Sequence, residues 1–177
     1  TPLTEDSACH EEFSHALCEA WEKEAAAVGD LGIRLCIIRL GIVLGKNGGV
    51  LKRMLPPFYF GLGGRIGSGQ QFMSWVHVND VIRAVHYLVD DNSLSGVFNL
   101  TAPGTVSNTQ FTQTIGKVIS RPTLFSLPAF VVKTIFGEMG ERLLLMGQSV
   151  VPHNLLQAGF SFDFPDLDGA LTDILIH

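Results

Sequence analysis

A glycine-dense loop that runs into a short strand and then a helix is the feature that most constrains this chain. Glycine recurs from Gly61 to Gly69, and it adopts positive φ angles and lets a ligand or another strand approach closely. Residues 74–78 then alternate large apolar with polar or small side chains, which predicts a short, half-buried strand. Asn79 and Asp80 supply side-chain oxygens that can cap a following helix. The order loop, strand, cap and helix predicts an element shaped for contact or tight turning.

The segment before this loop predicts a helix followed by a buried strand. Phe13, Leu17 and Trp21 recur at helical spacing within residues 11–28, with glutamates and a lysine largely on other faces. Residues 33–43 form a nearly continuous apolar run rich in β-branched side chains, as in strands of a parallel sheet that are buried on both faces. This pattern places the chain in the α/β class.

The remaining elements are shorter and are predicted from local start and stop signals. A helix over residues 48–55 is expected to stop at Pro56-Pro57, because a proline disfavours helical angles in the residue before it. Further expectations are helices over residues 79–90, 108–119, 128–137 and 141–146, short helices near Asn154 and Asp168, and strands over residues 97–100 and from Leu124. A soft boundary near Arg121 predicts a main domain, residues 1–120, and a small, mostly helical extension, residues 121–177.

Composition excludes several classes of partner. The net charge is -5 and the basic residues are scattered, which argues against a nucleic-acid surface. No apolar stretch is long enough to suggest a membrane partner. The three cysteines, Cys9, Cys18 and Cys36, lack metal-ligand spacing, so no metal is expected and the thiols suit a reducing compartment. Cytoplasmic localisation is the default expectation.

Several motifs together carry a family resemblance. They are Trp21-Glu22, the run from Arg39 to Gly45, the stretch Gly61-Leu-Gly-Gly-Arg-Ile-Gly-Ser-Gly-Gln-Gln71 followed by Trp75-Val-His-Val78, and Ala158-Gly-Phe160. In this order they resemble the atypical extended short-chain dehydrogenase/reductases, in the "epimerase family protein" branch of the NAD-dependent epimerase/dehydratases. The resemblance implies the C-terminal part of a Rossmann-type fold with a small, mostly helical substrate-side region.

Full-length members of that family begin with a glycine-rich turn that holds the cofactor pyrophosphate at a helix N-terminus. Nothing of that kind precedes Thr1, so the chain is interpreted as the C-terminal part of a longer protein. Hydrophobic residues make up 46% of the chain, an excess that predicts a surface meant to be covered. The expected partners are the missing N-terminal half of the same protein and, as an alternative, a second copy in a homo-oligomer.

A cofactor site is predicted at the carboxyl end of the strand over residues 33–43, because open α/β sheets bind ligands there. By position, the resemblance assigns the nicotinamide end of NADP or NAD, with NADP favoured, to Leu40, Gly41 and Val43, with Arg39 as a neighbour. The alternative interpretation is that Gly41 only permits a bend and that Arg39 pairs with a carboxylate.

The glycine-dense loop is predicted to line the substrate side through Gly64, Arg65, Gly67, Gly69 and Gln71. Sugar-nucleotide enzymes of the family continue this loop with an arginine that grips a diphosphate, a role suited to its planar fork. Here that position is Met73, which weakens the nucleotide-sugar interpretation. Arg65 either binds an anion or is simply exposed.

The family's catalytic pair is absent. Its dehydrogenases use Tyr-x-x-x-Lys on the helix before the buried strand, and the matching positions here are Phe13 and Leu17, which cannot transfer a proton. Relatives often carry Tyr-Tyr-Gly upstream of the point where this chain begins, and a displaced acid could sit there. His77 and Asp80 are expected to have structural roles, so catalytic residues stay unassigned.

Two functions remain open at this stage. One is an NAD(P)-dependent nucleotide-sugar epimerase/dehydratase-like oxidoreductase acting on an unknown small molecule. The other is a catalytically degenerate protein on the same fold that senses a cofactor or binds a partner.

Overall fold

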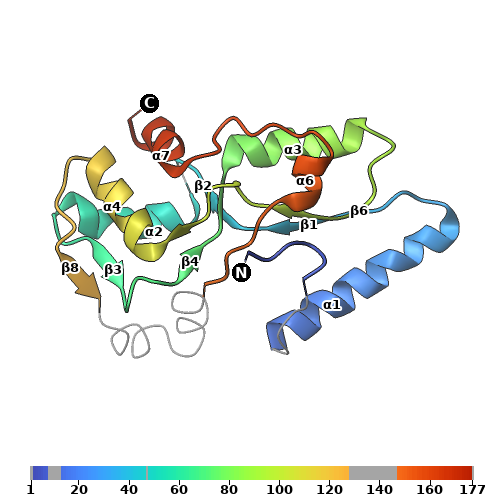
Figure 1. The fold of residues 1–177 in the computed structure, drawn as a ribbon, viewed down its shortest axis with the longest axis horizontal. Coiled ribbons are helices and arrows are strands. Elements are labelled where there is room, and N and C mark those ends of the chain that lie inside the picture. The colour runs from blue at the N-terminus through green and yellow to red at the C-terminus, as the bar shows by residue number, and fades with distance from the viewer. Residues whose placement is uncertain (1, 8–12, 47, 128–146, 177) are drawn as a thin grey trace.

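The computed structural model describes residues 2–7, 13–46, 48–127 and 147–176, and it has an elongated α/β arrangement (Figure 1). In chain order the elements are α1 (Phe13–Ala26), the 3₁₀ helix η1 (Ala27–Leu31), β1 (Cys36–Leu40), β2 (Ile42–Leu44), α2 (Gly49–Tyr59), β3 (Gly64–Ile66), β4 (Phe72–Met73), β5 (Trp75–His77), α3 (Val78–Asp90), β6 (Gly96–Leu100), β7 (Val106–Ser107), α4 (Asn108–Val118), β8 (Phe125–Leu127), α6 (His153–Gln157) and α7 (Leu167–Ile176). The helices predicted over residues 128–137 and 141–146 lie outside the described residues.

The predicted parallel strand is confirmed, but it is divided at Gly41. β1 pairs in parallel with β6, with Leu40 opposite Leu100, whereas β2 pairs in parallel with β5, with Ile42 opposite Trp75. The Gly41 amide still donates to the Leu100 carbonyl at 3.1 Å, and the next amide donates to Ser74. The chain therefore changes its neighbouring strand at Gly41.

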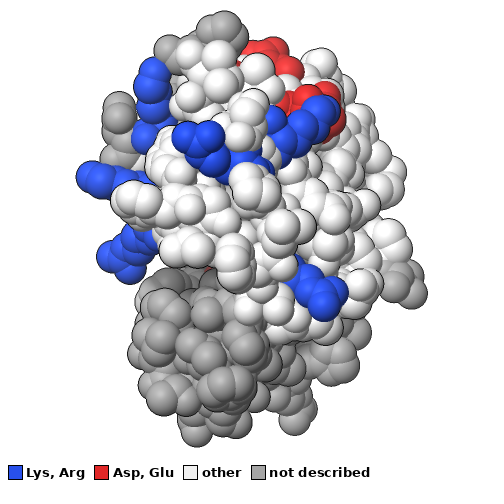
Figure 2. Space-filling view, turned by 90° about the vertical axis from the view of Figure 1, so that its left-hand side faces the viewer, with Lys and Arg blue, Asp and Glu red and all other residues white. Residues whose placement is uncertain are grey.

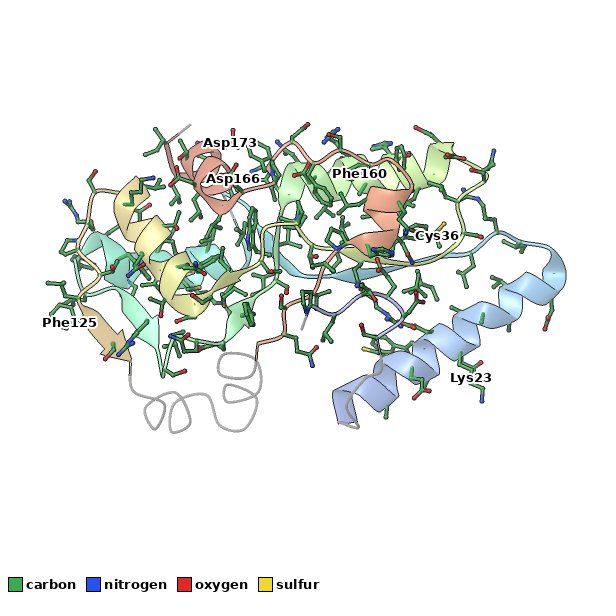
Figure 3. All side chains as sticks on the ribbon, viewed as in Figure 1. Lys23, Cys36, Phe125, Phe160, Asp166 and Asp173 are labelled. Atoms are coloured by element: carbon green, nitrogen blue, oxygen red, sulfur yellow. The ribbon has the colours of Figure 1, made fainter. Side chains whose placement is uncertain are left out.

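β5 separates two hydrophobic clusters. Trp75 belongs to a cluster built mainly by α2, α4 and α7, and Val76 to one built by α3, β6 and the region of α6. Successive side chains of a strand point to opposite faces, so these neighbours reach different cores. All three residues of β5 are buried, and the prediction of a half-buried strand was wrong because helices cover both faces. Figure 3 shows Phe160 of the second cluster beside α3.

α1 lies apart from the other elements in Figure 1, at the lower right. It ends through η1 at Gly32, which adopts φ 70°. Trp21 is 67% exposed, although the sequence pattern places it on an apolar face. β1 is half-buried rather than buried, because the described residues pair it with a strand along one edge alone.

α2 contradicts the predicted stop at Pro56-Pro57, since the helix continues to Tyr59. Both prolines are exposed, whereas Leu55 and Phe58 on either side of them are buried in the core. The carbonyl oxygens that lose a partner to these prolines belong to exposed residues, so water can satisfy them. Core packing therefore extends the helix past the local signal.

The boundary predicted near Arg121 stays a prediction. Leu167 and Leu171 of α7 lie in the same cluster as Leu44 and Trp75. None of the helices in the described part of the chain combines the length and apolar character that a membrane span requires.

The point where the chain passes from β1 to β2, which we call the Gly41 junction, yields a stability prediction. A Cβ at this position would lie 2.6 Å from the Ser74 carbonyl oxygen and 2.8 Å from Thr101 Cγ2, so Gly41→Ala should lower the free energy of unfolding by about 1–3 kcal/mol. Gly29→Ala is the control, because a Cβ there meets nothing within 4 Å. Urea unfolding followed by circular dichroism measures both, and an equal response would exclude the steric argument.

Candidate functional site

Four segments meet around Gly41, at the carboxyl end of β1. They are Ser74 before β5, Thr101 after β6, the stretch 147–151 and the N-terminal stretch 2–5. The Ser74 hydroxyl donates to the Gln148 carbonyl at 2.7 Å and accepts from the Val150 amide at 2.9 Å. The Thr101 hydroxyl donates to the Val150 carbonyl at 3.1 Å. These bonds tie the stretch 147–151 to the strand end where a cofactor site was predicted.

The predicted cofactor residues occupy different environments at this junction. Leu40 is 57% exposed at the end of β1, and Gly41 brings the backbone close to Ser74 and Thr101. Val43 is half-buried and packs against the cluster that contains Val76. Leu40 and the backbone at Gly41 are the parts of this set that a ligand outside the strand end can reach.

Arg39 forms the carboxylate pair that the alternative interpretation expected. Its Nε and Nη2 donate to the two carboxylate oxygens of Glu22 at 2.7 and 2.6 Å, and Nη1 donates to the Glu5 carbonyl at 3.4 Å. A bidentate ion pair of this kind fixes the orientation of both side chains. Arg39 therefore holds α1 and the N-terminal stretch against β1.

Glu5 anchors the N-terminal stretch and was not singled out from the sequence. Its side chain is buried, and Oε1 accepts from the amides of Asn99 and Asn154 at 2.9 and 3.2 Å. Oε2 is buried and has no hydrogen-bond partner among the described residues. No periodicity in the sequence marks Glu5 as buried.

The loop 61–71 is a rigid turn held on α4. Gly67 and Gly69 adopt φ 59° and 72°, which favours glycine. The Gln71 side chain donates to the Ile66 carbonyl at 2.9 Å, and the Ile66 amide donates to Asn108 Oδ1 at 2.8 Å. These residues close the loop on itself, while the Arg65 side chain is exposed.

The positions that depart from the family pattern have apolar surroundings or solvent around them. Met73 is 7% exposed and its sulfur contacts the Asn108 amide, so the side chain points into the core. Leu17 is 41% exposed on α1. The side chain of Phe13 lies outside the described part of the chain. Neither Met73 nor Leu17 supplies a polar group to a ligand.

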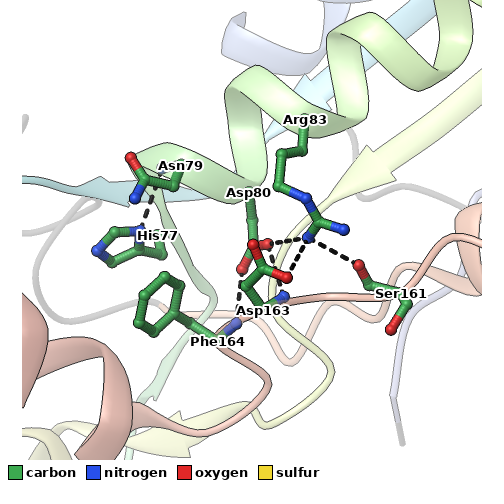
Figure 4. A network of polar contacts seen from close by, with 7 residues as sticks. All are labelled: His77, Asn79, Asp80, Arg83, Ser161, Asp163 and Phe164. Carbon is green, nitrogen blue, oxygen red and sulfur yellow. Dashed lines mark hydrogen bonds and ion pairs between the residues drawn. The ribbon is translucent and has the colours of Figure 1, made fainter.

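Asp80 joins α3 to the C-terminal stretch, as Figure 4 shows. The side chain is fully buried and accepts from the amides of Asp163 and Phe164 at 2.8 and 3.0 Å. Arg83 donates to Asp80 at 3.0 Å and pairs with Asp163 at 2.8 Å. The expectation that Asp80 caps its own helix was wrong. The amides that Asp80 binds belong to Asp163 and Phe164, which are more than 80 residues away in the sequence.

His77 caps α3 in place of Asn79 or Asp80. Its Nδ1 accepts from the Asn79 amide at 3.1 Å, which assigns the ring proton to Nε2. Nε2 lies 3.3 Å from an Asp173 oxygen but lacks the alignment of a hydrogen bond, and the ring stacks on Phe164 with centroids 3.9 Å apart. Burial lowers the pKa of His77 below 6.5, against the opposing charges of Asp173 and Asp80. The structural role expected for His77 is the one observed.

The described residues contain no group of three or more His, Cys, Asp or Glu side chains arranged to hold a metal ion. Among the described residues, the Gly41 junction combines backbone groups, the Ser74 and Thr101 hydroxyls and the exposed Leu40 side chain.

The parallel strands, the helices that cover them and the open strand end define a Rossmann-type α/β protein. The family model described as "NAD dependent epimerase/dehydratase family" matches residues 8–101, and a domain of unknown function, DUF1731, matches residues 127–174. The chain belongs to the NAD-dependent epimerase/dehydratase family.

Relatives and solved structures agree with this assignment. The epimerase family protein ML0860 of Mycobacterium leprae is 42% identical over 160 residues, which are 90% of this chain and 52% of that protein. The crystal structure of human epimerase family protein SDR39U1 with NADPH has a TM-score of 0.93 and 38% identity, covering 98% of this chain and 59% of that one. A nucleoside-diphosphate sugar epimerase from Corynebacterium glutamicum has a TM-score of 0.80 and 27% identity, covering 99% of this chain and 33% of that one.

The predicted fold class and the predicted resemblance to epimerase family proteins are confirmed. The chain spans about half the length of the curated relatives it matches.

Removal of the buried charge at Asp80 should destabilise the chain. Asp80→Asn leaves one oxygen for two amides and weakens the pair with Arg83, so we expect a loss of about 2–4 kcal/mol in the free energy of unfolding. Asp163→Asn is the matched control, because it removes an exposed carboxylate from the same arginine and should cost under about 1 kcal/mol. Chemical unfolding compares the two, and similar losses would contradict the role of burial.

Stability should fall as the pH drops below 6.5 because of His77. The folded state favours the neutral ring, whereas the unfolded chain takes up a proton as the pH passes below its ordinary pKa of 6.5. His77→Asn keeps an oxygen that can cap α3 but cannot titrate. Thermal unfolding between about pH 7.5 and 5.5 should show a steeper loss of Tm in the unchanged chain than in the variant, and parallel curves would refute this assignment.

Proposed function

We propose that the chain forms the nicotinamide-side and substrate-side part of an NAD(P)-dependent oxidoreductase of the epimerase/dehydratase type, acting on a small molecule. The observation that carries this proposal is the strand end at Leu40 and Gly41, which lies at the carboxyl end of a parallel strand. The solved human relative with the same fold at 38% identity contains NADPH, which supports NADPH as the cofactor.

The Gly41 junction supplies position rather than chemistry. β1 leaves β6 and β2 joins β5 at this point, so the neighbouring strands diverge and the strand end is accessible. Exposed Leu40 offers an apolar surface for a nicotinamide ring. Arg39 acts as a positioning residue through its pair with Glu22, which holds α1 in place.

The site is completed, in this proposal, by a preceding segment of the same protein that binds the adenosine and pyrophosphate. Exposed Trp21 and Leu40, together with the unpaired edge of β1 among the described strands, are the surface that such a segment would cover. NADP or NAD would then lie between the two parts, with the loop 61–71 on the substrate side.

The second candidate is a cofactor-sensing or partner-binding protein on the same fold. It is favoured by Leu17 and Met73, which occupy positions where the family places a lysine and an arginine. Buried Met73 excludes a diphosphate grip at that position. The oxidoreductase and the cofactor sensor both predict cofactor binding and differ in turnover, whereas a partner-binding protein requires no cofactor.

Titration calorimetry with NADPH and NADH tests the shared cofactor site. The full-length protein should bind NADPH, and Leu40→Glu should weaken binding at least about tenfold, or 1.4 kcal/mol. Ile82→Glu on α3 is the matched control, because Ile82 is 53% exposed against 57% for Leu40, and it should leave the affinity unchanged. The 177-residue chain should bind far more weakly. No binding to the full-length protein would refute the oxidoreductase and the cofactor sensor, and it would favour the partner-binding protein.

Oxidation of NADPH with a panel of carbonyl compounds and nucleotide sugars then separates the oxidoreductase from the cofactor sensor. Reproducible turnover supports the oxidoreductase. Tight binding without turnover across the panel supports the sensor.

A further inference from the structure

A groove on the Arg65 side of β3 carries an inference about ligand chemistry. It has a volume of about 290 Å³, near the lower end of the range for small-molecule sites. Three elements enclose it: β3, the first half of α4 and the stretch 123–126 that contains the start of β8. Its polar lining consists of Arg65, Thr109, Thr112, Gln113, Thr123 and Ser126.

Close backbone contacts give the groove fixed walls. β3 and β8 pair in parallel, with Arg65 opposite Ser126. A Cβ on Gly64 would lie 1.4 Å from the Phe125 carbonyl oxygen, and one on Gly116 would lie 2.4 Å from Thr123 Cγ2. Glycine at both positions lets the stretch 123–126 approach β3 and α4, so the lining groups are held at a set separation.

The lining has one sign of charge. Arg65 is the single ionisable side chain of the lining. Arg65 Nη1 donates to the Ser68 carbonyl at 3.3 Å, and the other N–H groups of the guanidinium can bind a ligand. Thr109 donates its hydroxyl to the Gly69 carbonyl at 3.0 Å. Thr112 is 2% exposed, and its buried hydroxyl has no hydrogen-bond partner among the described residues.

The surroundings favour an anion as well. β3, β8, α2 and α4 lie in the left-hand half of Figure 1. Figure 2 shows this side of the molecule, where Lys and Arg side chains are spread over the face and Asp and Glu side chains gather at its upper edge. The net charge of the chain is -5, so a basic face is a local departure from the whole.

The groove also has an apolar side. Leu124 and Phe125 line it, and both are exposed, at 88% and 56%. Figure 3 places Phe125 at the far left edge of the molecule, on β8. Because Arg65 lies opposite Ser126 and successive side chains of a strand alternate between faces, Leu124 rather than Phe125 shares the face of Arg65. A ligand that only neutralised Arg65 would leave Leu124 in water.

We infer that this groove binds a small organic anion, whose carboxylate or phosphate pairs with Arg65 and whose apolar part covers Leu124. Guanidinium binds both oxyanions through two parallel hydrogen bonds. The inference rests on the proposed function only in treating the loop 61–71 as a ligand-facing element. It needs no cofactor, because Arg39, Leu40, Gly41 and Val43 do not line the groove.

The test is titration of the 177-residue chain with phenyl phosphate, benzoate, inorganic phosphate and neutral benzyl alcohol, followed by amide chemical shifts. We expect shifts at the amides of Arg65, Thr112 and Phe125, with a Kd of about 1 mM for the better of the two aromatic anions. The better anion identifies the oxyanion. Inorganic phosphate should bind more weakly and benzyl alcohol should not bind.

Variants separate the groove from general attraction to a basic face. Arg65→Gln should weaken binding at least about tenfold, while Arg53→Gln, which removes an exposed charge from α2 outside the groove, should leave it unchanged.

Absence of localised shifts, equal losses in the two arginine variants, or binding that survives Arg65→Gln would overturn the inference. Failure of the NADPH proposal can be distinguished from failure of the anion inference by two variants. Arg65→Gln in the full-length protein should leave NADPH affinity unchanged, and Leu40→Glu should leave the binding of the aromatic anion unchanged.

Discussion

The close approach of backbones at Gly41 is the constraint on which the rest of this structure depends. A strand that pairs with β6 up to Leu40 must join β5 from Ile42, and no side chain fits between the Ser74 carbonyl and Thr101 at the crossing point. Because the two halves of the strand have different neighbours, β5 can carry Trp75 into one core and Val76 into the other. Leu40, the last residue of β1 before this crossing, is 57% exposed, so the candidate cofactor site lies beside the point where the strand changes its neighbour.

Side chains with acid and base chemistry serve here as ties between distant parts of the chain. Asp80 holds the stretch at Asp163 and Phe164, Glu5 holds β6 and α6, and Arg39 holds α1 through Glu22. Each of these contacts satisfies a buried amide or a charge that would otherwise be costly to bury. Among the described residues, the carboxylates of Glu5 and Glu22 near the Gly41 junction serve such contacts.

Prediction from the sequence succeeded where a signal is local. The helices at α3 and α4 follow from start and stop signals, and the parallel strand at β1 follows from a continuous apolar run. The resemblance to epimerase family proteins follows from several motifs in a fixed order. The sequence interpretation failed at Pro56-Pro57, where burial of Leu55 and Phe58 overrides a stop signal. The sequence interpretation also failed at Asp80. A carboxylate at a helix start lies near the amides of its own helix, and the sequence does not show that the amides of Asp163 and Phe164 compete for that carboxylate. The Arg65 groove was out of reach for the same reason, since α4 and residues 123–126 enclose it from more than 40 residues away along the chain.

The sequence by itself determined the α/β class and the family. Through the resemblance it also assigned Leu17 and Met73 to positions where a lysine and an arginine are expected, and it predicted the residues that could lie at a strand end. These properties depend on residue type and on separations of a few positions, which sequence patterns record directly. Only the tertiary structure decided that Arg39 pairs with Glu22, that His77 rather than Asn79 or Asp80 caps α3, and that Arg65 faces a groove with Thr112. Each of these depends on which competing partner or face the folded chain brings close, and that choice is made by the packing of both cores around the crossing at Gly41.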